Sequence, residues 1–455
     1  MTEGVSSGHE NHGAERNASE DVANSLSLAG AVALGTGVMI GAGIFALTGQ
    51  AAGLAGDLFP LAFLVAAVVV AFSAYSYVKL ANAFPSSGGV AMFLREEYGL
   101  GTTTGVFALF MYVSMVINQS LVARTFGAYT LQILEVEPAS FWVPTLGVAL
   151  LVIAFAINLA GNRLIQAAEG VMAIVKIAGL ALFAVAGLWF VTSANLTNGS
   201  DASGFSVSAD GFLAAVALAI LAYKGFTTIT NSGGEIIDPH RNTGRAIVIS
   251  LSICTVLYLA LSVAVAGNLT LPEIIAAQDS VLAEAARPAF GDAGLWFTIV
   301  LAVIATASGV IASIFAASRM LAMLTRMKEV PHRHFGLPGT VRTHSMIYTV
   351  AFAMILTIAF DLRRIAALGA IFYLIMDIAI HWGILRHLRS RIDVKPAIVV
   401  TAIVLDITVL SAFVWVKASA DALILYVSAA GIAAIVIGER LFMRSHTDSH
   451  GNMDM

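Results

Sequence analysis

Four glycines occur in the eleven residues from Gly35 to Phe45, inside the first long apolar stretch of the chain. Each interior glycine costs a helix about 1 kcal/mol relative to alanine, so this concentration requires a reason. One reason is close packing against another helix, for which Gly37 and Gly41 have the GxxxG spacing. The other is an interrupted helix, whose freed N–H groups bind carboxylates and whose freed carbonyls bind ammonium groups.

A second cluster of residues that disfavour helix lies in another apolar stretch, at AYKGFTTITNSGGE over residues 222–235. It combines Gly225 with Lys224, several threonines and a pair of glycines. Interrupted helices in corresponding positions of two halves indicate a transport site between inverted repeats. The two clusters together therefore favour interruption at both positions over packing alone.

Charged residues also occur deep in the apolar stretches, where each costs about 2.5–3.5 kcal/mol unless it has a partner or a task. Lys176 can exchange a proton with its surroundings or form a structural ion pair. Arg124 and Asp377 both lie near mid-depth and are expected to pair with each other. Asn118 is a candidate contact for a substrate side chain, with hydrogen bonding inside the core as the alternative.

The composition requires a membrane to surround these segments. The chain has 455 residues, of which 58% are hydrophobic and 11% are charged, whereas soluble domains carry about 25% charged residues. The net charge of −4 argues against a nucleic-acid partner. The lone Cys254 excludes an internal disulfide. We find no HExxH, GxSxG, phosphate-loop lysine or Cys/His ligand spacing, so we expect no catalytic residues, metal site or cofactor.

Apolar runs long enough to span a bilayer number twelve. They lie at about residues 28–52, 58–83, 103–134, 143–161, 166–193, 211–237, 246–268, 294–325, 344–361, 365–387, 397–416 and 421–442. The expected division is a disordered cytoplasmic tail (1–25), helices one to five (26–193), helices six to ten (211–387), two C-terminal helices (397–442) and a cytoplasmic tail (443–455).

Lysine and arginine between the spans concentrate on the side that holds the N-terminus, while the opposite side holds only Arg287, Arg363, Arg364 and Lys417. The positive-inside rule then places a multi-pass protein in the cell membrane with both termini in the cytoplasm.

Two features are expected at the ends of the bundle. The stretch Leu271–Gly291 is too polar to span but helical in pattern, and is expected to lie across the extracellular face as a lid. Asn195–Gly204 is expected to be an external loop. Glu235 can pair with Arg241 or Arg245 at the cytoplasmic end of span six, or can simply stabilise a helix terminus.

Four segments look like the amino acid–polyamine–organocation (APC) superfamily of permeases. They are MIGAGIF at residues 39–45, AYSYVKLANAFPSSGG at 74–89, AYKGF…GGEIIDPHRNTGRAI at 222–247, and SRMLAMLTRMKEVP at 318–331. The resemblance implies an all-α fold of twelve transmembrane helices, with a five-plus-five inverted repeat, broken helices one and six, and two further C-terminal helices.

The resemblance also implies a substrate site made largely of backbone. The N–H groups of Gly41, Ala42 and Gly43 would receive a carboxylate. The carbonyls near Met39, Ile40, Leu221, Ala222 and Lys224 would accept from an ammonium, and Tyr223 and Phe226 would border the side-chain pocket. Thr227 departs from the family, many of whose members carry Glu there. The Lys224 side chain either points at the site, where it would repel cations, or snorkels away.

Lys176 matches a helix-five lysine that, in proton-coupled or exchanging APC members, takes the place of a sodium ion. Its expected neighbours are a carbonyl near Val38 and the hydroxyl of Ser313. The implied function is proton-coupled, sodium-independent transport of amino acids by alternating access. An amino acid exchanger and an organic amine or polyamine permease are alternatives, and a channel is a remote one. The expected partners are the amino acid, protons and lipid, and the sequence leaves the oligomeric state open.

Overall fold

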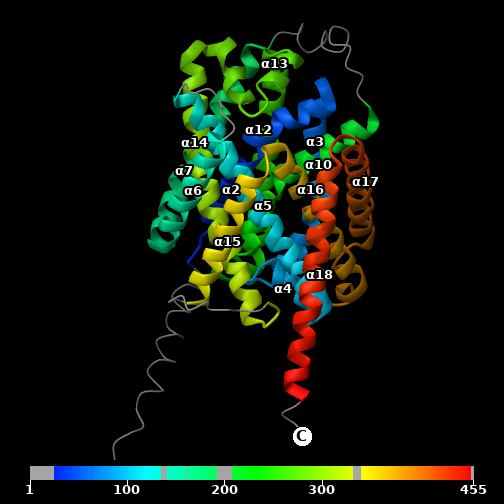
Figure 1. The fold of residues 1–455 in the computed structure, drawn as a ribbon. Coiled ribbons are helices and arrows are strands. Elements are labelled where there is room, and N and C mark those ends of the chain that lie inside the picture. Colours follow the sequence, from blue (N-terminus) through cyan, green and yellow to red (C-terminus); the bar gives the residue numbers. More distant parts are fainter. Residues whose placement is uncertain (1–24, 135–140, 161, 192–207, 331–339, 452–455) are drawn as a thin grey trace, which may run out of the picture.

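The computed structural model describes residues 25–134, 141–160, 162–191, 208–330 and 340–451. Helices account for nearly all of these residues (Figure 1). The predicted N-terminal tail up to residue 24 and the external loop at Asn195–Gly204 lie outside the described residues.

The long helices follow the predicted apolar runs closely. In the first half they are α2 (Leu28–Ala55), α3 (Phe59–Ala83), α5 (Thr102–Leu134), α6 (Trp142–Ala160) and α7 (Asn162–Trp189). In the second half they are α10 (Ala209–Tyr223), α12 (Pro239–Asn268), α14 (Val281–Arg326), α15 (Val341–Ala359) and α16 (Leu362–Gly383), followed by α17 (Pro396–Ala420) and α18 (Ala422–Gly451). The short α4 (Val90–Tyr98) and α13 (Leu271–Ala276) lie between them.

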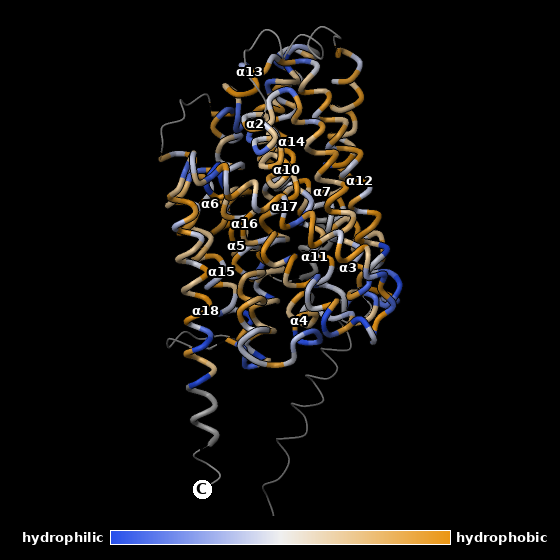
Figure 2. The backbone as a smooth tube through the Cα atoms, turned by 90° about the vertical axis from the view of Figure 1, so that its right-hand side faces the viewer, coloured by the Kyte–Doolittle hydropathy of each residue, from blue (hydrophilic) through white to orange (hydrophobic). Residues whose placement is uncertain are grey.

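Eleven stretches within the described residues are long and apolar enough to cross a membrane, and the first of them covers both α2 and α3. Gly56, with φ 55°, and a single 3₁₀ turn over Gly56–Leu58 separate these two helices. The long helices therefore correspond one to one with the predicted apolar runs. Figure 2 shows hydrophobic residues along the middle of the bundle and hydrophilic stretches toward its two ends. The inverted relation between the two halves stays a prediction.

The helices differ in how far protein surrounds them. The apolar window of α10 is 89% buried, whereas that of α18 is 17% buried. Large apolar side chains such as Trp189, Trp415 and Tyr426 are exposed on the outer helices, as expected for a lipid-facing surface. Residues on α10 and its neighbours can therefore be charged or polar only if they find partners inside the protein.

The two predicted interruptions have different outcomes. The sixth span is interrupted as predicted: α10 ends at Tyr223, a 3₁₀ turn covers Lys224–Phe226, and α11 covers Thr227–Thr230. The predicted break in the first span is wrong for this structure, because α2 is helical throughout, including Gly41–Gly43. Its glycines instead permit close approach: a Cβ on Gly41 would lie 2.7 Å from the carbonyl oxygen of Ala305 in α14.

The end of the bundle that carries the C-terminus is closed by contacts of the segment between α11 and α12. The backbone N–H of Leu26 donates to the carbonyl of Glu235 at 2.8 Å, and that of Ile237 donates to the carbonyl of Leu26 at 2.9 Å. The Glu235 carboxylate forms an ion pair with Arg319 near the end of α14, rather than with the arginines that begin α12. These contacts tie α2, α14 and the interrupted sixth span together at this end.

The opposite end is covered by the predicted lid. Figure 1 shows α13 at the end of the bundle away from the C-terminus, and helix resumes in α14 at Val281. The Gln278 amide donates to Gln50 at 3.0 Å, Gln50 donates to Asp279 at 3.1 Å, and Arg363 donates to Gln278 at 3.0 Å. Burial raises the pKa of Asp279 in this connection. The lid is thus held by side chains of both α2 and α16.

Candidate functional site

The two glycine-containing segments meet in the core. A Cβ on Gly225 would lie 2.6 Å from the backbone nitrogen of Met39, and a Cβ on Gly43 would lie 2.9 Å from the carbonyl of Ala222. The hydroxyl of Tyr258 on α12 completes this contact, since it would lie 2.5 Å from the same Gly43 Cβ and donates to the Ala222 carbonyl at 3.4 Å. The structure therefore brings together the two segments that the sequence singled out.

The glycine contacts of α2 give a testable contrast within one helix. A methyl group at Gly41 would overlap backbone atoms of Ala305 and Gly309, whereas a methyl at Gly53 has no neighbour closer than 4.0 Å. Gly41→Ala should lower the free energy of unfolding by about 1–3 kcal/mol, because backbone atoms cannot move aside. Gly53→Ala should be neutral or stabilising by up to about 1 kcal/mol. Thermal unfolding of the two variants in detergent measures the difference, and equal midpoints would contradict close packing at Gly41.

Two of the five carbonyls expected to face a substrate ammonium already accept from hydroxyl groups of the protein. Thr227 Oγ1 donates to the Lys224 carbonyl at 2.9 Å, in addition to the bond at Ala222. The Tyr223 hydroxyl donates to the Phe63 carbonyl at 3.4 Å, and the Phe226 ring meets Tyr77 edge-on with centroids 5.2 Å apart. The remaining side chains of this predicted set that the structure describes, Met39, Ile40 and Leu221, are buried.

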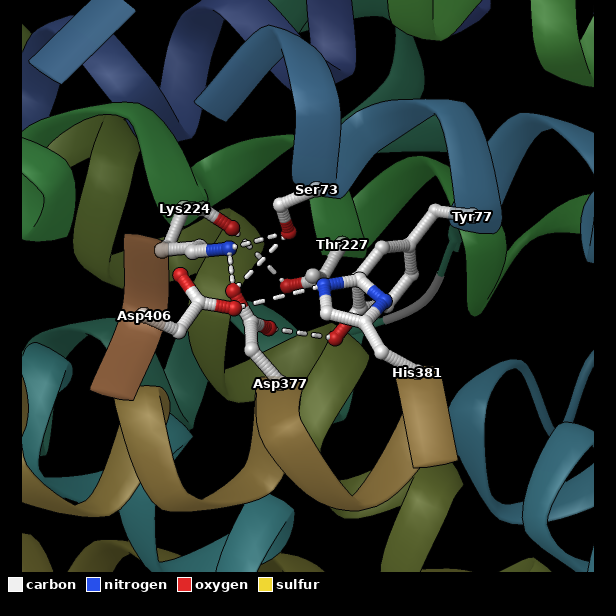
Figure 3. A network of polar contacts seen from close by, with 7 residues as sticks. All are labelled: Ser73, Tyr77, Lys224, Thr227, Asp377, His381 and Asp406. Carbon is white, nitrogen blue, oxygen red and sulfur yellow. Dashed lines mark hydrogen bonds and ion pairs between the residues drawn. The ribbon is translucent and has the colours of Figure 1, made fainter. Parts of the chain in front are cut away.

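The Lys224 side chain is directed into the protein core toward α16. It is 1% exposed and forms an ion pair with Asp377 of α16, so it does not snorkel to the membrane surface. Ser73 of α3 accepts from Lys224 at 3.0 Å and donates to Asp377 at 2.9 Å, and the Tyr77 hydroxyl donates to Asp377 at 2.7 Å (Figure 3). This arrangement corrects the expected pairing of Asp377 with Arg124, which instead donates to the Thr357 carbonyl at 2.8 Å.

A second ion pair lies beside the first. His381, one turn beyond Asp377 on α16, has its Nε2 at 3.4 Å from Oδ2 of Asp406 on α17, and both side chains are buried. Figure 3 shows the side chains of Lys224, Asp377, His381 and Asp406 converging. They come from the 3₁₀ turn of the sixth span, from α16 and from α17. Asp377, His381 and Asp406 place ligand-type atoms within 4.8 Å of one another. Because the ammonium of Lys224 already supplies the positive charge at Asp377, we treat these residues as a charge cluster rather than a metal site.

We call Lys224, Asp377, His381 and Asp406 the buried charge cluster. Sequence reasoning named Asp377 and Lys224 but not Ser73, Tyr77 or His381. The available signal was spacing: residues 73 and 77, and residues 377 and 381, are each four apart and so share a helix face.

Lys176 on α7 is a second buried cation, separate from the buried charge cluster. Its ammonium donates to the carbonyl of Gly37 at 3.4 Å and to Ser308 Oγ at 2.5 Å. The carbonyl is that of Gly37, next to Val38, as expected, whereas the expected hydroxyl is wrong, because Ser308 lies five residues before Ser313. Ser313 instead accepts, through its carbonyl, a hydrogen bond from Gln119 at 3.1 Å. The neighbouring Asn118 is 5% exposed, in the core of α5.

Comparison with known proteins assigns the chain to a family. A family model described as "Amino acid permease" matches residues 26–437, which covers every long helix except the last part of α18. The chain belongs to this amino acid permease family. The family is part of the APC superfamily that the sequence resembles, and it identifies the protein as a membrane transporter rather than an enzyme.

Similar proteins occur in distant organisms. The inner membrane transport protein YbaT of Escherichia coli is 28% identical over 391 residues, covering 86% of this chain and 90% of the relative. The uncharacterized protein MJ0609 of Methanocaldococcus jannaschii is 27% identical over 92% of this chain and 94% of its own length. The uncharacterized transporter Rv1999c of Mycobacterium tuberculosis is 31% identical over 71% of this chain and 72% of its own length. This permease is thus similar to transporters over most of its length.

Proposed function

We propose that this permease is a secondary active transporter of amino acids that works by alternating access and couples transport to protons without sodium. The observation that carries the proposal is the contact between the interrupted sixth span and the glycine-rich centre of α2. In a transporter fold, an interrupted helix places main-chain groups where a substrate's charged groups can reach them.

Substrate binding in this proposal requires α2 to open locally. In the structure the N–H groups of Gly41–Gly43 belong to a continuous helix and so are not free donors. The high glycine content lowers the cost of unwinding that turn, by about 1 kcal/mol for each glycine relative to alanine. The freed N–H groups would receive the carboxylate, while carbonyls at the interruption would exchange their present hydroxyl donors for the substrate ammonium.

The Lys224–Asp377 ion pair carries no net charge, which widens the range of substrates that the site could accept. The Lys224 ammonium is directed toward Asp377 and paired with it, which removes the expected reason for rejecting cations. Neutral amino acids, cationic amino acids and simple organic amines therefore all belong in a substrate test.

Lys176 supports proton coupling. Its ammonium is bound by a carbonyl of α2 and a hydroxyl of α14, which are oxygen ligands of the kind that a hard cation prefers. A fixed ammonium at this position excludes a sodium ion by charge, and a lysine can release and regain its proton as its surroundings change. Because one of its two contacts comes from α2, protonation of Lys176 would depend on the same helix that must open.

Alternating access is supported by the two sets of closing contacts. The Glu235–Arg319 pair closes one end and the Gln278–Gln50 contact closes the other, and both involve helices of the central contact. We place the Glu235 end and both termini in the cytoplasm, as the distribution of lysine and arginine indicates.

The test is counterflow in proteoliposomes with a panel of labelled amino acids and amines, in sodium-containing and sodium-free buffers. We expect saturable exchange of at least one amino acid, uphill uptake driven by an acidic exterior, and no stimulation by sodium. Counterflow without uphill uptake would identify an exchanger, and exchange restricted to amines would identify an amine permease. Flux that does not saturate with concentration would indicate a channel and contradict the proposal.

A further inference from the structure

We propose that His381 and Asp406 form a proton-binding pair whose occupancy is controlled by the position of Lys224 in the interrupted sixth span. The pair lies on α16 and α17, apart from the contact that Lys176 makes with α2 and α14. The inference rests on the proposed transport function and deepens it, because it names a second group that exchanges a proton during the cycle.

Charge balance in the buried cluster carries the first step. The ammonium of Lys224 neutralises the carboxylate of Asp377, which leaves His381 and Asp406 to balance each other. A neutral cluster requires one further proton on this pair, held either as an imidazolium beside a carboxylate or as a neutral imidazole beside a carboxylic acid. Loss of that proton would leave an unpaired negative charge at a site that is 0% exposed, which is costly in a membrane.

The hydrogen bonding of the pair supports proton exchange. Neither the His381 side chain nor the Asp406 side chain makes a hydrogen bond to a third residue in the described part of the chain, and the two face each other at 3.4 Å between Nε2 and Oδ2. Asp377, by contrast, accepts from Ser73, Tyr77 and Lys224. Three donors hold the Asp377 carboxylate in its charged form. His381 and Asp406 have no donor from outside their pair, so they are the part of the cluster that can change its protonation.

The groups around the pair define its electrostatic environment. On Asp406 the charged neighbours are Asp377, His381 and Lys224. The Tyr77 ring meets His381 edge-on at 6.4 Å between centroids. Glu97 of α4 approaches from the end that carries the C-terminus, and burial raises its pKa, which favours an uncharged carboxyl there. Lys224 is therefore the one cation facing the pair within the described residues.

The location of Lys224 connects proton binding to the transport movement. It lies in the 3₁₀ turn of the interruption, while its partners Ser73 and Asp377 lie on the α-helices α3 and α16. If substrate binding shifts this turn and withdraws the ammonium, the cluster loses one positive charge and must take up a proton to stay neutral. When Lys224 returns, that proton is released. The coupling is reciprocal, so protonation of the pair also favours the conformation in which Lys224 is withdrawn.

The test measures the number of protons moved per substrate in proteoliposomes, from the pH gradient that just balances a substrate gradient. We expect His381→Gln and, independently, His381→Asn to move one proton fewer per substrate than the wild-type permease, because Asp406 alone already holds the one proton of the neutral cluster and cannot take up a second. The control is Asp393→Asn, which alters an exposed carboxylate paired with Lys79 and should leave the ratio unchanged. Thermal unfolding of the purified variants across a pH series gives a second readout, in which a pH-dependent step of the wild type should disappear from both variants.

The outcomes separate this inference from the proposed function. A wild-type ratio of zero, with no substrate-linked proton movement, would overturn the proposed coupling itself. A coupled wild type with unchanged ratios and unchanged pH steps in His381→Gln and His381→Asn would overturn only the proton-binding pair. If one variant does not fold, the other gives the same test, because either substitution removes the imidazole.

Discussion

Replacing Lys224 by methionine is expected to lower the free energy of unfolding by about 3–5 kcal/mol, because Asp377 would remain as a buried charge without its cation. The double variant Lys224→Met/Asp377→Asn should recover most of that loss. Its asparagine carbonyl can still accept from Tyr77, and no net charge remains on the two residues. Thermal unfolding in detergent of both single variants and the double variant gives the coupling energy directly.

A surface pair provides the matched control for this experiment. Lys79 lies 3.5 Å from Asp393, whose side chain is fully exposed, and such pairs contribute about 0–1 kcal/mol. Lys79→Met should therefore change the midpoint little. If the double variant at Lys224 and Asp377 is as unstable as the sum of its single variants, the two residues are not coupled and the charge-balance argument is wrong.

Lys176→Ala is expected to reduce the rate of pH-dependent uptake by about tenfold or more, since a barrier change of 1.4 kcal/mol already corresponds to that factor. The substitution removes the ammonium that connects the carbonyl of Gly37 to the hydroxyl of Ser308. Uptake driven by an acidic exterior, measured in proteoliposomes over a range of external pH, tests this expectation. A full pH response in the variant would contradict proton coupling at Lys176.

Two serines sharpen the experiment at Lys176. Ser308→Ala removes a hydroxyl that the ammonium contacts, and should shift the pH profile of uptake. Ser313 lies five residues further along α14, and it is its backbone carbonyl that accepts from Gln119. Ser313→Ala should therefore leave the profile unchanged. The opposite result would restore the neighbour expected from the sequence.

The predictions that succeeded rest on properties of single segments. That the protein spans a membrane, and where its long helices lie, follow from the length of the apolar runs. That α10 ends at Tyr223 follows from the residues after it, which disfavour helix. The family followed from four motifs that the permease model later confirmed over residues 26–437. Each of these signals is local, so one sequence was enough to identify it.

The predictions that failed concern how a segment is used by its neighbours. The glycines of α2 predict both close packing and interruption, and only the proximity of Ala305 and Gly309 shows that packing applies in this structure. Ser313 and Ser308 lie five residues apart on α14, and the rotation of that helix against α7 decides which of them meets Lys176. Counting along the chain from a motif does not determine that rotation.

By itself, the sequence determined that this protein is a helical membrane transporter whose sixth span is interrupted, because composition and local helix propensity set those features. Only the tertiary structure decided the partners of the buried charges. Asp377 could have met Arg124 at similar depth. Instead, α16 packs against α3 and against the interrupted part of the sixth span, and this packing places Asp377 beside Lys224. In a medium that cannot solvate charge, residues far apart in the chain must pair wherever the helices bring them together, and helix packing sets those pairs.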